Sequence, residues 1–171
     1  MLAQKIIHSL KKKKFKIAVA ESITGGLIAK TITDIPGASQ VFECGWVTYS
    51  NKSKNKILGV PLKTLQKYGA VSKETVASMA LFAKTKSGAD MALAITGFAG
   101  PDAPKKSDIG QVFIAIVAHK YLKTEEKKFK GNREEIRAQA CYGALSLVEK
   151  TLLSSPQILS HPGRGRTRKG R

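Results

Sequence analysis

Residues 15–32 read FKIAVA-ESITGG-LIAKTI, and this stretch decides the fold. Phe15 to Ala20 is apolar apart from one lysine and predicts a short buried strand. Glu21 to Gly26 interrupts it with small and hydroxyl-bearing residues and two glycines, which favour a tight turn. Leu27 to Ile32 continues as a helix. The stretch therefore predicts a strand followed directly by a helix, as in α/β proteins.

The rest of the chain alternates strands and helices around this unit. Further strands are predicted at Val41 to Tyr49, Ala89 to Thr96, Gln111 to His119 and Tyr121 to Lys130. Helices are predicted at Leu2 to Leu10, Ser53 to Leu58, Leu62 to Tyr68, Ser72 to Ser87 and Asn132 to Leu153. The last two strands form a hairpin and several strands are apolar throughout. We therefore expect an α/β fold, a three-layer α/β/α sandwich with a mixed central sheet.

Length and composition fit one folded domain. The 171 residues are 42% hydrophobic, and we expect a domain at residues 1–155 followed by a basic, flexible tail at 156–171. No apolar run approaches the roughly 18 residues that cross a bilayer, and the N-terminus lacks the charge order of a signal peptide. We expect a cytoplasmic protein without a membrane partner. Cys44 and Cys141 form no CxxC pair, so neither a zinc site nor a disulfide framework is predicted.

The net charge of +18 suggests a nucleic-acid or polyanion partner as one reading. The distribution of the charged residues along the chain favours a different interpretation. Part of the excess is in the tail, part is the Lys11–Lys14 run after the first helix, and few aromatic residues accompany the other lysines. A solvated surface is the preferred interpretation, and a nucleic-acid-binding module is the alternative.

Residues that could carry chemistry follow three of the predicted strands. The segments are Glu21 to Gly26, Tyr49 to Asn51, and Thr96 to Pro101. Ligands of α/β sheets bind beyond the carboxyl ends of the strands. We therefore expect the three segments to meet at one site.

Ser22 and Lys54 are the candidate catalytic pair. Ser22 lies where the strand turns into the helix, beside backbone N–H groups that could hold an oxyanion; the alternative is that it caps the helix. None of the three histidines is well placed to act as its base. A buried lysine with a lowered pKa could do so. The spacing of Tyr49 and Lys54 can aim a phenol and an amine at one pocket, whereas the alternative is a solvated lysine.

Six motifs occur in order along the chain. They are AESITGGL (20–27), TDIPGAS (33–39), VTYSNKSK (47–54), LGVP (58–61), GAVS (69–72) and TGFAGP (96–101). Together they resemble the CinA C-terminal domain family, whose enzymes are nicotinamide-nucleotide amidases. The resemblance runs from about Leu2 to Leu153.

This resemblance implies deamidation of nicotinamide mononucleotide to nicotinate mononucleotide and ammonia, without a metal or cofactor. By motif, Ser22 corresponds to the nucleophile, Lys54 to the general base, Tyr49 to a phenol beside it, and Thr96 to a hydroxyl that holds or relays protons. The substrate's pyridinium cation would also favour a neutral lysine nearby. The family suggests a homodimer, and the lack of an additional N-terminal domain suggests a stand-alone amidase.

Further residues are predicted to bind the nucleotide substrate. They are Glu21, Thr24, Gly25, Gly26, Asn51, Gly97, Gly100, Arg133 and Arg137. Arg133 lies in the first turn of the last helix, so its guanidinium and the helix N-terminus could together hold the substrate phosphate, with Arg137 one turn further on. The alternative is two exposed arginines balanced by neighbouring glutamates.

The chain departs from the family pattern at two places. Ile23 stands where the family commonly has cysteine, and the loop from Asp102 to Asp108 is charged where the family usually has several glycines. The altered loop leaves the preference among nicotinamide derivatives open. A catalytically silent relative that binds a pyridine nucleotide is a third reading.

Overall fold

The computed structural model describes residues 1–154 and contains a five-stranded sheet. The strands are β1 (Ile17–Glu21), β2 (Phe42–Val47), β3 (Met91–Gly97), β4 (Gln111–Ala118) and β5 (Tyr121–Lys128), in the spatial order β2-β1-β3-β4-β5. β1 pairs in parallel with β2 and β3, whereas β3–β4 and β4–β5 are antiparallel. The predicted mixed sheet and its terminal hairpin are confirmed.

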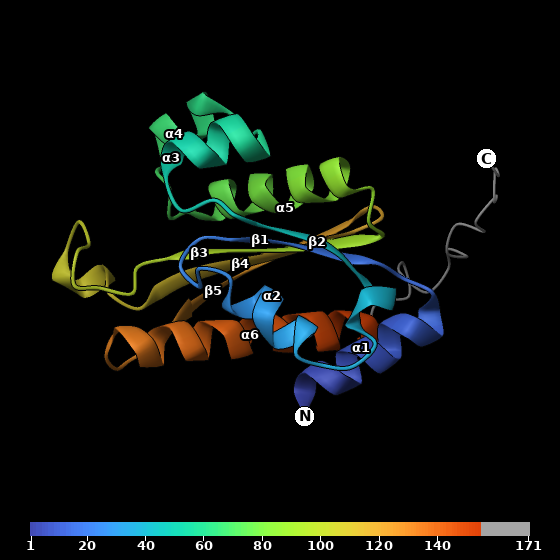
Figure 1. The fold of residues 1–171 in the computed structure, drawn as a ribbon. Helices are drawn as coiled ribbons and strands as arrows, with labels where there is room; N and C mark the ends of the chain where they lie inside the picture. Colours follow the sequence, from blue (N-terminus) through green and yellow to red (C-terminus); the bar gives the residue numbers. More distant parts are fainter. Residues whose placement is uncertain (155–171) are drawn as a thin grey trace.

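Helices cover both faces of the sheet (Figure 1). One face carries α1 (Leu2–Lys13), α2 (Leu27–Thr33) and α6 (Arg133–Ser154). The other carries α3 (Asn51–Ser53), α4 (Leu62–Tyr68) and α5 (Lys73–Ser87). This arrangement is the three-layer α/β/α sandwich that the strand and helix pattern predicts. Among the described residues, no helix combines the length and apolar character needed to cross a membrane.

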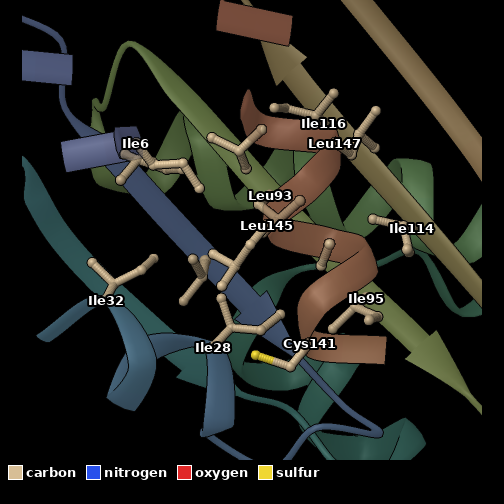
Figure 2. Close-up of a cluster of buried hydrophobic side chains, with 14 of the residues drawn as sticks. Ile6, Ile28, Ile32, Leu93, Ile95, Ile114, Ile116, Cys141, Leu145 and Leu147 are labelled. Atoms are coloured by element: carbon tan, nitrogen blue, oxygen red, sulfur yellow. The ribbon is translucent and has the colours of Figure 1, made fainter. Parts of the chain in front are cut away.

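The two faces of the central strands differ in side-chain size. Large residues such as Val19, Leu93 and Ile114 face α1, α2 and α6 and form one buried cluster (Figure 2). Alanines such as Ala20, Ala94 and Ala115 face α5 and form a second cluster with it. Because successive strand residues point to opposite faces, the even-numbered residues of β1 and β3, and those of β2 from Cys44 onward, lie on the α5 side. Phe42, before the irregularity in the β1–β2 register, packs on the other face.

Two helix starts are capped as the sequence indicates. The Ser72 hydroxyl accepts a hydrogen bond of 3.2 Å from the Thr75 backbone N–H at the start of α5. At α6, Asn132 Oδ1 accepts from the N–H groups of Glu134 and Glu135, and Glu135 Oε2 accepts from the Asn132 N–H. The predicted capping box is therefore formed.

One predicted helix has a different form. Instead of a helix from Ser53 to Leu58, the chain forms the single turn α3 followed by a π-helical segment at Lys54–Leu58. Gly59, with φ of 100°, ends the segment, and the N–H groups of Gly59 and Val60 both donate to the Lys54 carbonyl. Wide turns of this kind are frequent at functional sites. Here the turn buries Lys54 and leaves Lys52 and Lys56 exposed.

The predicted domain boundary at residue 155 falls at the edge of the described residues. The basic tail at 156–171 lies outside them.

Candidate functional site

The carboxyl ends of β1, β2 and β3 carry three hydroxyl residues in a row. Backbone pairing continues one residue beyond the strands: the Ser22 N–H donates to the Ile95 carbonyl at 3.1 Å, and the Thr48 N–H donates to the Glu21 carbonyl at 2.8 Å. The parallel registers, extended by one residue, place Ser22 between Thr48 and Thr96. All three are even-numbered and lie on the α5 side.

Lys54 reaches the middle of this row from the π-helical segment. Its Nζ donates to Ser22 Oγ at 2.8 Å, to the Thr48 carbonyl at 2.8 Å and to the Tyr49 carbonyl at 3.4 Å. The residue is only 1% exposed. The predicted nucleophile and base, 32 positions apart in the sequence, are thus in direct contact.

The amine is buried without an acidic partner. No carboxylate of the described residues forms an ion pair with Lys54. Burial lowers the pKa of Lys54 from 10.5 to about 8, because a cation loses solvation when it leaves water. The neutral form of the amine is therefore populated near physiological pH, although the ammonium form is the larger fraction.

The three contacts of Nζ also orient the neutral amine. A neutral amine keeps two N–H donors and one lone pair. The carbonyls of Thr48 and Tyr49 accept hydrogen bonds but cannot donate them, so they hold the two N–H groups. The remaining direction, which carries the lone pair, points to Ser22 Oγ. This is the geometry required of a general base for the serine.

Glu21 shapes the loop after Ser22. Its buried carboxylate accepts hydrogen bonds from the backbone N–H groups of Gly26, Ile28 and Ala29 at 3.0, 3.1 and 2.8 Å. These bonds cap the N-terminus of α2 with a negative charge, which the helix dipole favours. The sequence predicts that Glu21 binds the substrate. In the structure, its carboxylate binds backbone N–H groups instead.

The same loop leaves backbone donors free beside Ser22. Among residues 1–154, no acceptor is bound by the N–H groups of Ile23 or Thr24. Gly25 and Gly26, with φ of 60° and 99°, turn the chain through a left-handed conformation that other residues rarely adopt. Paired free donors next to a nucleophile can hold an oxyanion.

Arg137 of α6 forms hydrogen bonds with this loop. Its Nε donates to the Ile23 carbonyl at 3.1 Å and its Nη2 to the Thr24 carbonyl at 2.8 Å. The carbonyls face the arginine, so the two peptide units between Ile23 and Gly25 are held from the side of α6. The structure thus uses Arg137 to position the loop, a contact that differs from the predicted phosphate contact.

Arg133 joins two other segments. Nη1 donates to the Gly100 carbonyl, and Nη2 donates to the Tyr49 phenol oxygen at 2.7 Å. The structure therefore brings the β2–α3 and β3–β4 connections together at the start of α6, at one end of the sheet (Figure 1). The Tyr49 phenol is exposed and lies with Arg133, whereas only the Tyr49 carbonyl contacts the Lys54 amine.

The expected use of the α6 N-terminus for phosphate needs a correction. The N–H groups of Glu134 and Glu135 already donate to the Asn132 side chain. A capped helix end does not offer these donors to an anion. Arg133, which keeps further N–H donors, remains the candidate cation there.

Thr96, Gly97 and Asn51 complete the predicted set. Thr96 is 1% exposed and its hydroxyl donates to the Ala70 carbonyl at 2.9 Å, which holds the turn before α5. A Cβ on Gly97 would lie 2.7 Å from the Gln111 carbonyl and 3.0 Å from Ile23 Cδ1, so only glycine fits between the serine loop and β4. Asn51 begins α3 with an exposed side chain.

Sequence reasoning missed Thr48 as a site residue. It is fully buried, and its carbonyl is one of the acceptors for Lys54. The signal was present in the pattern of β2, because the inward-facing positions 44 and 46 are followed at the same spacing by Thr48. Only the register with Ser22, which sequence alone does not give, shows that it neighbours the nucleophile.

The chain matches a known protein family along nearly all of its described length. The model of the CinA C-terminal domain matches residues 1–152. A putative competence-damage inducible protein of Caldicellulosiruptor saccharolyticus is 42% identical over 154 residues, covering 90% of this chain and 38% of the relative. A CinA-like protein of Geotalea uraniireducens is 46% identical over 141 residues, covering 82% of this chain and 34% of the relative. The chain thus spans little more than a third of the length of these relatives.

Solved structures share the same fold. A competence-damaged protein (CinA) superfamily protein from Klebsiella pneumoniae superposes with a TM-score of 0.87 at 30% identity, covering 90% of this chain and 97% of that one. A competence/damage inducible protein from Agrobacterium tumefaciens gives a TM-score of 0.85 at 37% identity, covering 90% and 94%.

Proposed function

Because the chain belongs to the CinA C-terminal domain family, we propose that it is a nicotinamide-nucleotide amidase. It converts nicotinamide mononucleotide to nicotinate mononucleotide and ammonia, with Ser22 as the nucleophile and Lys54 as the general base. The substrate class is the one that the motif resemblance implies.

One observation carries the catalytic part of this proposal: the buried Lys54 amine lies 2.8 Å from Ser22 Oγ without a carboxylate partner. A buried lysine that served only the fold would be stabilised by an acidic partner. Placing an unpaired amine against a serine costs stability. That cost is explained if the amine must be neutral in order to accept a proton.

Acylation of Ser22 is the first half of the reaction. Lys54 accepts the hydroxyl proton as Ser22 Oγ attacks the amide carbon, and the free N–H groups of Ile23 and Thr24 bind the oxyanion. The pyridinium ring withdraws electrons from the amide and makes its carbon more reactive. The Lys54 ammonium then protonates the departing nitrogen, so ammonia leaves and an acyl ester remains on Ser22.

Hydrolysis of the ester completes the cycle. Lys54, neutral again after ammonia has left, takes a proton from the attacking water. It returns that proton to Ser22 Oγ as the ester bond breaks. The same amine therefore serves both half-reactions, and no metal or cofactor takes part in this scheme.

We assign the substrate phosphate to Arg133. Its guanidinium is exposed, and its present acceptors, the Gly100 carbonyl and the Tyr49 phenol, are both uncharged. A phosphate would make stronger, charge-assisted bonds with the same fork of donors. We also retain the homodimer as a proposal from the resemblance, and sedimentation equilibrium of the purified chain tests it.

Ammonia release from nicotinamide mononucleotide, with and without a chelator, tests the function directly. We expect turnover in both conditions and none in Ser22→Ala. An inactive wild-type protein, or an active Ser22→Ala variant, would contradict the proposal. Equilibrium binding of the nucleotide by an inactive wild-type protein would favour the catalytically silent reading instead. A panel of nicotinamide derivatives then gives the substrate preference.

A further inference from the structure

Thr48 lies in the row of hydroxyls at the site, and neither the motif resemblance nor the proposed reaction gives its side chain a role. It neighbours Ser22 across the extended β1–β2 register, on the same face of the sheet. Its own carbonyl accepts a 2.8 Å hydrogen bond from Lys54 Nζ. The residue therefore neighbours the amine as well as the serine.

The hydroxyls of this row differ in what they bind. Thr96 donates to the Ala70 carbonyl, and Ser22 accepts from Lys54. Thr48 Oγ1, in a fully buried residue, has no hydrogen-bond partner among the described residues. A buried hydroxyl without a partner is costly, and a catalytic role or a bound water is among the explanations for one that neighbours a nucleophile.

A water molecule that enters with the substrate is the simplest partner for this hydroxyl. Thr48 Oγ1 makes no direct hydrogen bond to Ser22 or Lys54, although its residue neighbours both. A water held between protein groups needs at least two polar anchors. The Thr48 hydroxyl and the Lys54 amine are two such anchors.

We propose that the Thr48 hydroxyl positions the water that hydrolyses the Ser22 acyl ester. The proposal rests on the proposed amidase function and adds a positioning residue for its second half. Acylation does not use this water, because there the nucleophile is Ser22 itself.

The step balances without a further reactant. The water oxygen forms a bond to the acyl carbon, and one of its protons passes to the neutral Lys54 amine. The tetrahedral intermediate then breaks the carbon–Oγ bond, and Lys54 returns the proton to Ser22 Oγ. The product leaves as the carboxylic acid, which loses its proton to solvent. Thr48 is unchanged throughout.

Steady-state kinetics of Thr48→Val on nicotinamide mononucleotide tests the proposal. Valine keeps the shape of the side chain and removes the hydroxyl. For an acyl-enzyme reaction, kcat/KM reports the steps up to acylation, whereas a slow hydrolysis limits kcat alone. We expect kcat to fall about 10- to 100-fold, as for other losses of positioning, with KM falling in parallel and kcat/KM near the wild-type value.

Rapid-mixing measurements on the same variant add a direct readout. Ammonia should appear in a burst of about one equivalent per active site, followed by slow turnover, because acylation proceeds and hydrolysis lags. Mass spectrometry of the quenched protein should detect the acyl group on Ser22. Thr48→Ser, which restores a hydroxyl, should recover most of kcat.

Thr151 provides a matched control. It is also a buried threonine whose hydroxyl has no partner among the described residues, and it lies in α6, about 27 Å along the helix from Arg133. Thr151→Val should leave both kcat and KM unchanged. Thermal unfolding of all the variants checks that they fold, and Thr48→Ala replaces the valine variant if that one does not.

The outcomes separate the two proposals. A wild-type protein that releases no ammonia contradicts the amidase function itself. If the wild type is active and Thr48→Val has the same kcat and KM, the role of Thr48 is overturned and the amidase function stands. A variant in which kcat and kcat/KM fall together, without a burst, also overturns it, because the hydroxyl would then act in acylation.

Discussion

The Lys54 amine leaves water on folding and gains only uncharged partners, namely the Ser22 hydroxyl and two backbone carbonyls. Carbonyl dipoles offset part of the lost hydration but do not neutralise a charge. The lowered pKa of about 8 follows from this imbalance. At the scale of a single residue, the same burial that costs stability provides the neutral amine that the proposed reaction uses as its base.

The pH dependence of activity should report this amine. We expect kcat/KM to rise with pH around a midpoint near 8, because only the neutral form of Lys54 accepts the serine proton. The substrate's cation should lower the pKa of the amine further in the complex, so the midpoint for kcat should lie below that for kcat/KM. Both are measured by ammonia release between about pH 6 and pH 10. A flat profile, or the reverse order of midpoints, would remove Lys54 from the role of base.

Stability should depend on pH through the same residue. Between about 8 and 10.5 the unfolded chain binds a proton at Lys54 that the folded chain does not, so the folded state gains stability as the pH rises. Relative to Lys54→Met, the free energy of unfolding of the wild type should therefore rise by about 3 kcal/mol between these two pH values. Below about pH 8 the full cost of burying the charge applies.

Urea unfolding of both proteins at several pH values measures the difference. Because all other groups are shared, their titration cancels. Lys56, exposed on the same turn, supplies the control variant Lys56→Met, which should not follow the trend. The free energy of unfolding of the wild type, relative to that of Lys54→Met, should rise with pH. If this difference stays constant or falls, the amine is not buried in its neutral form.

At the scale of elements, the loop between β1 and α2 depends on Glu21. Its carboxylate binds three backbone N–H groups at the start of α2. Glu21→Gln replaces one acceptor oxygen by a donor and removes the charge, so at least one of these N–H groups loses its partner. We expect a loss of about 1–3 kcal/mol in the free energy of unfolding. We also expect a lower kcat/KM, because the free N–H groups of Ile23 and Thr24 belong to the same loop.

Chemical denaturation and ammonia release measure the two effects of Glu21→Gln. The control is Glu43→Gln, which removes an exposed carboxylate that lies 3.6 Å from Lys16 at the surface. Surface ion pairs contribute little, so this control should change stability by less than about 1 kcal/mol and leave activity intact. Equal effects of the two variants would show that Glu21 does not hold the loop.

Sequence pattern predicts the elements well where the apolar pattern of a segment is unambiguous. The run from Met91 to Ile95 is apolar at every position and is a strand buried on both faces. The segment after β2 shows where pattern fails. Lys52, Lys54 and Lys56 alternate in a polar stretch, and no helical period distinguishes the buried member from its neighbours. The π-helical geometry selects Lys54, and the sequence reached it only through the motif resemblance.

The arginines show a second limit. Their positions on α6 were predicted, but their partners depend on which carbonyls the folded loops present. Arg137 meets the carbonyls of Ile23 and Thr24, and Arg133 meets the Gly100 carbonyl and the Tyr49 phenol. A cation near a predicted phosphate site can equally bind the protein itself. Only the tertiary fold distinguishes the two.

At the scale of the whole molecule, α6 links the site to the point where the described chain ends. The helix begins at Arg133 beside the site and runs for 22 residues, about 33 Å, to Ser154. Figure 1 shows it passing beneath the sheet from one end to the other. Ser154, where the described chain ends, therefore lies far from Ser22 and Lys54. Catalysis and the charge of the tail can be tested separately.

Removal of residues 156–171 tests what the basic tail contributes. The truncation deletes five Lys and Arg residues and no acidic residue, so the net charge falls from +18 to +13. If the tail binds polyanions, the full chain should bind duplex DNA with an affinity that decreases steeply with salt, and truncation should flatten that dependence by about 0.9 in log–log slope for each phosphate that the tail neutralises. Ammonia release should be unchanged, because the site lies at the other end of α6. Equal salt dependence of the two proteins would place any DNA binding on the folded domain, and loss of amidase activity on truncation would mean that the tail acts at the site.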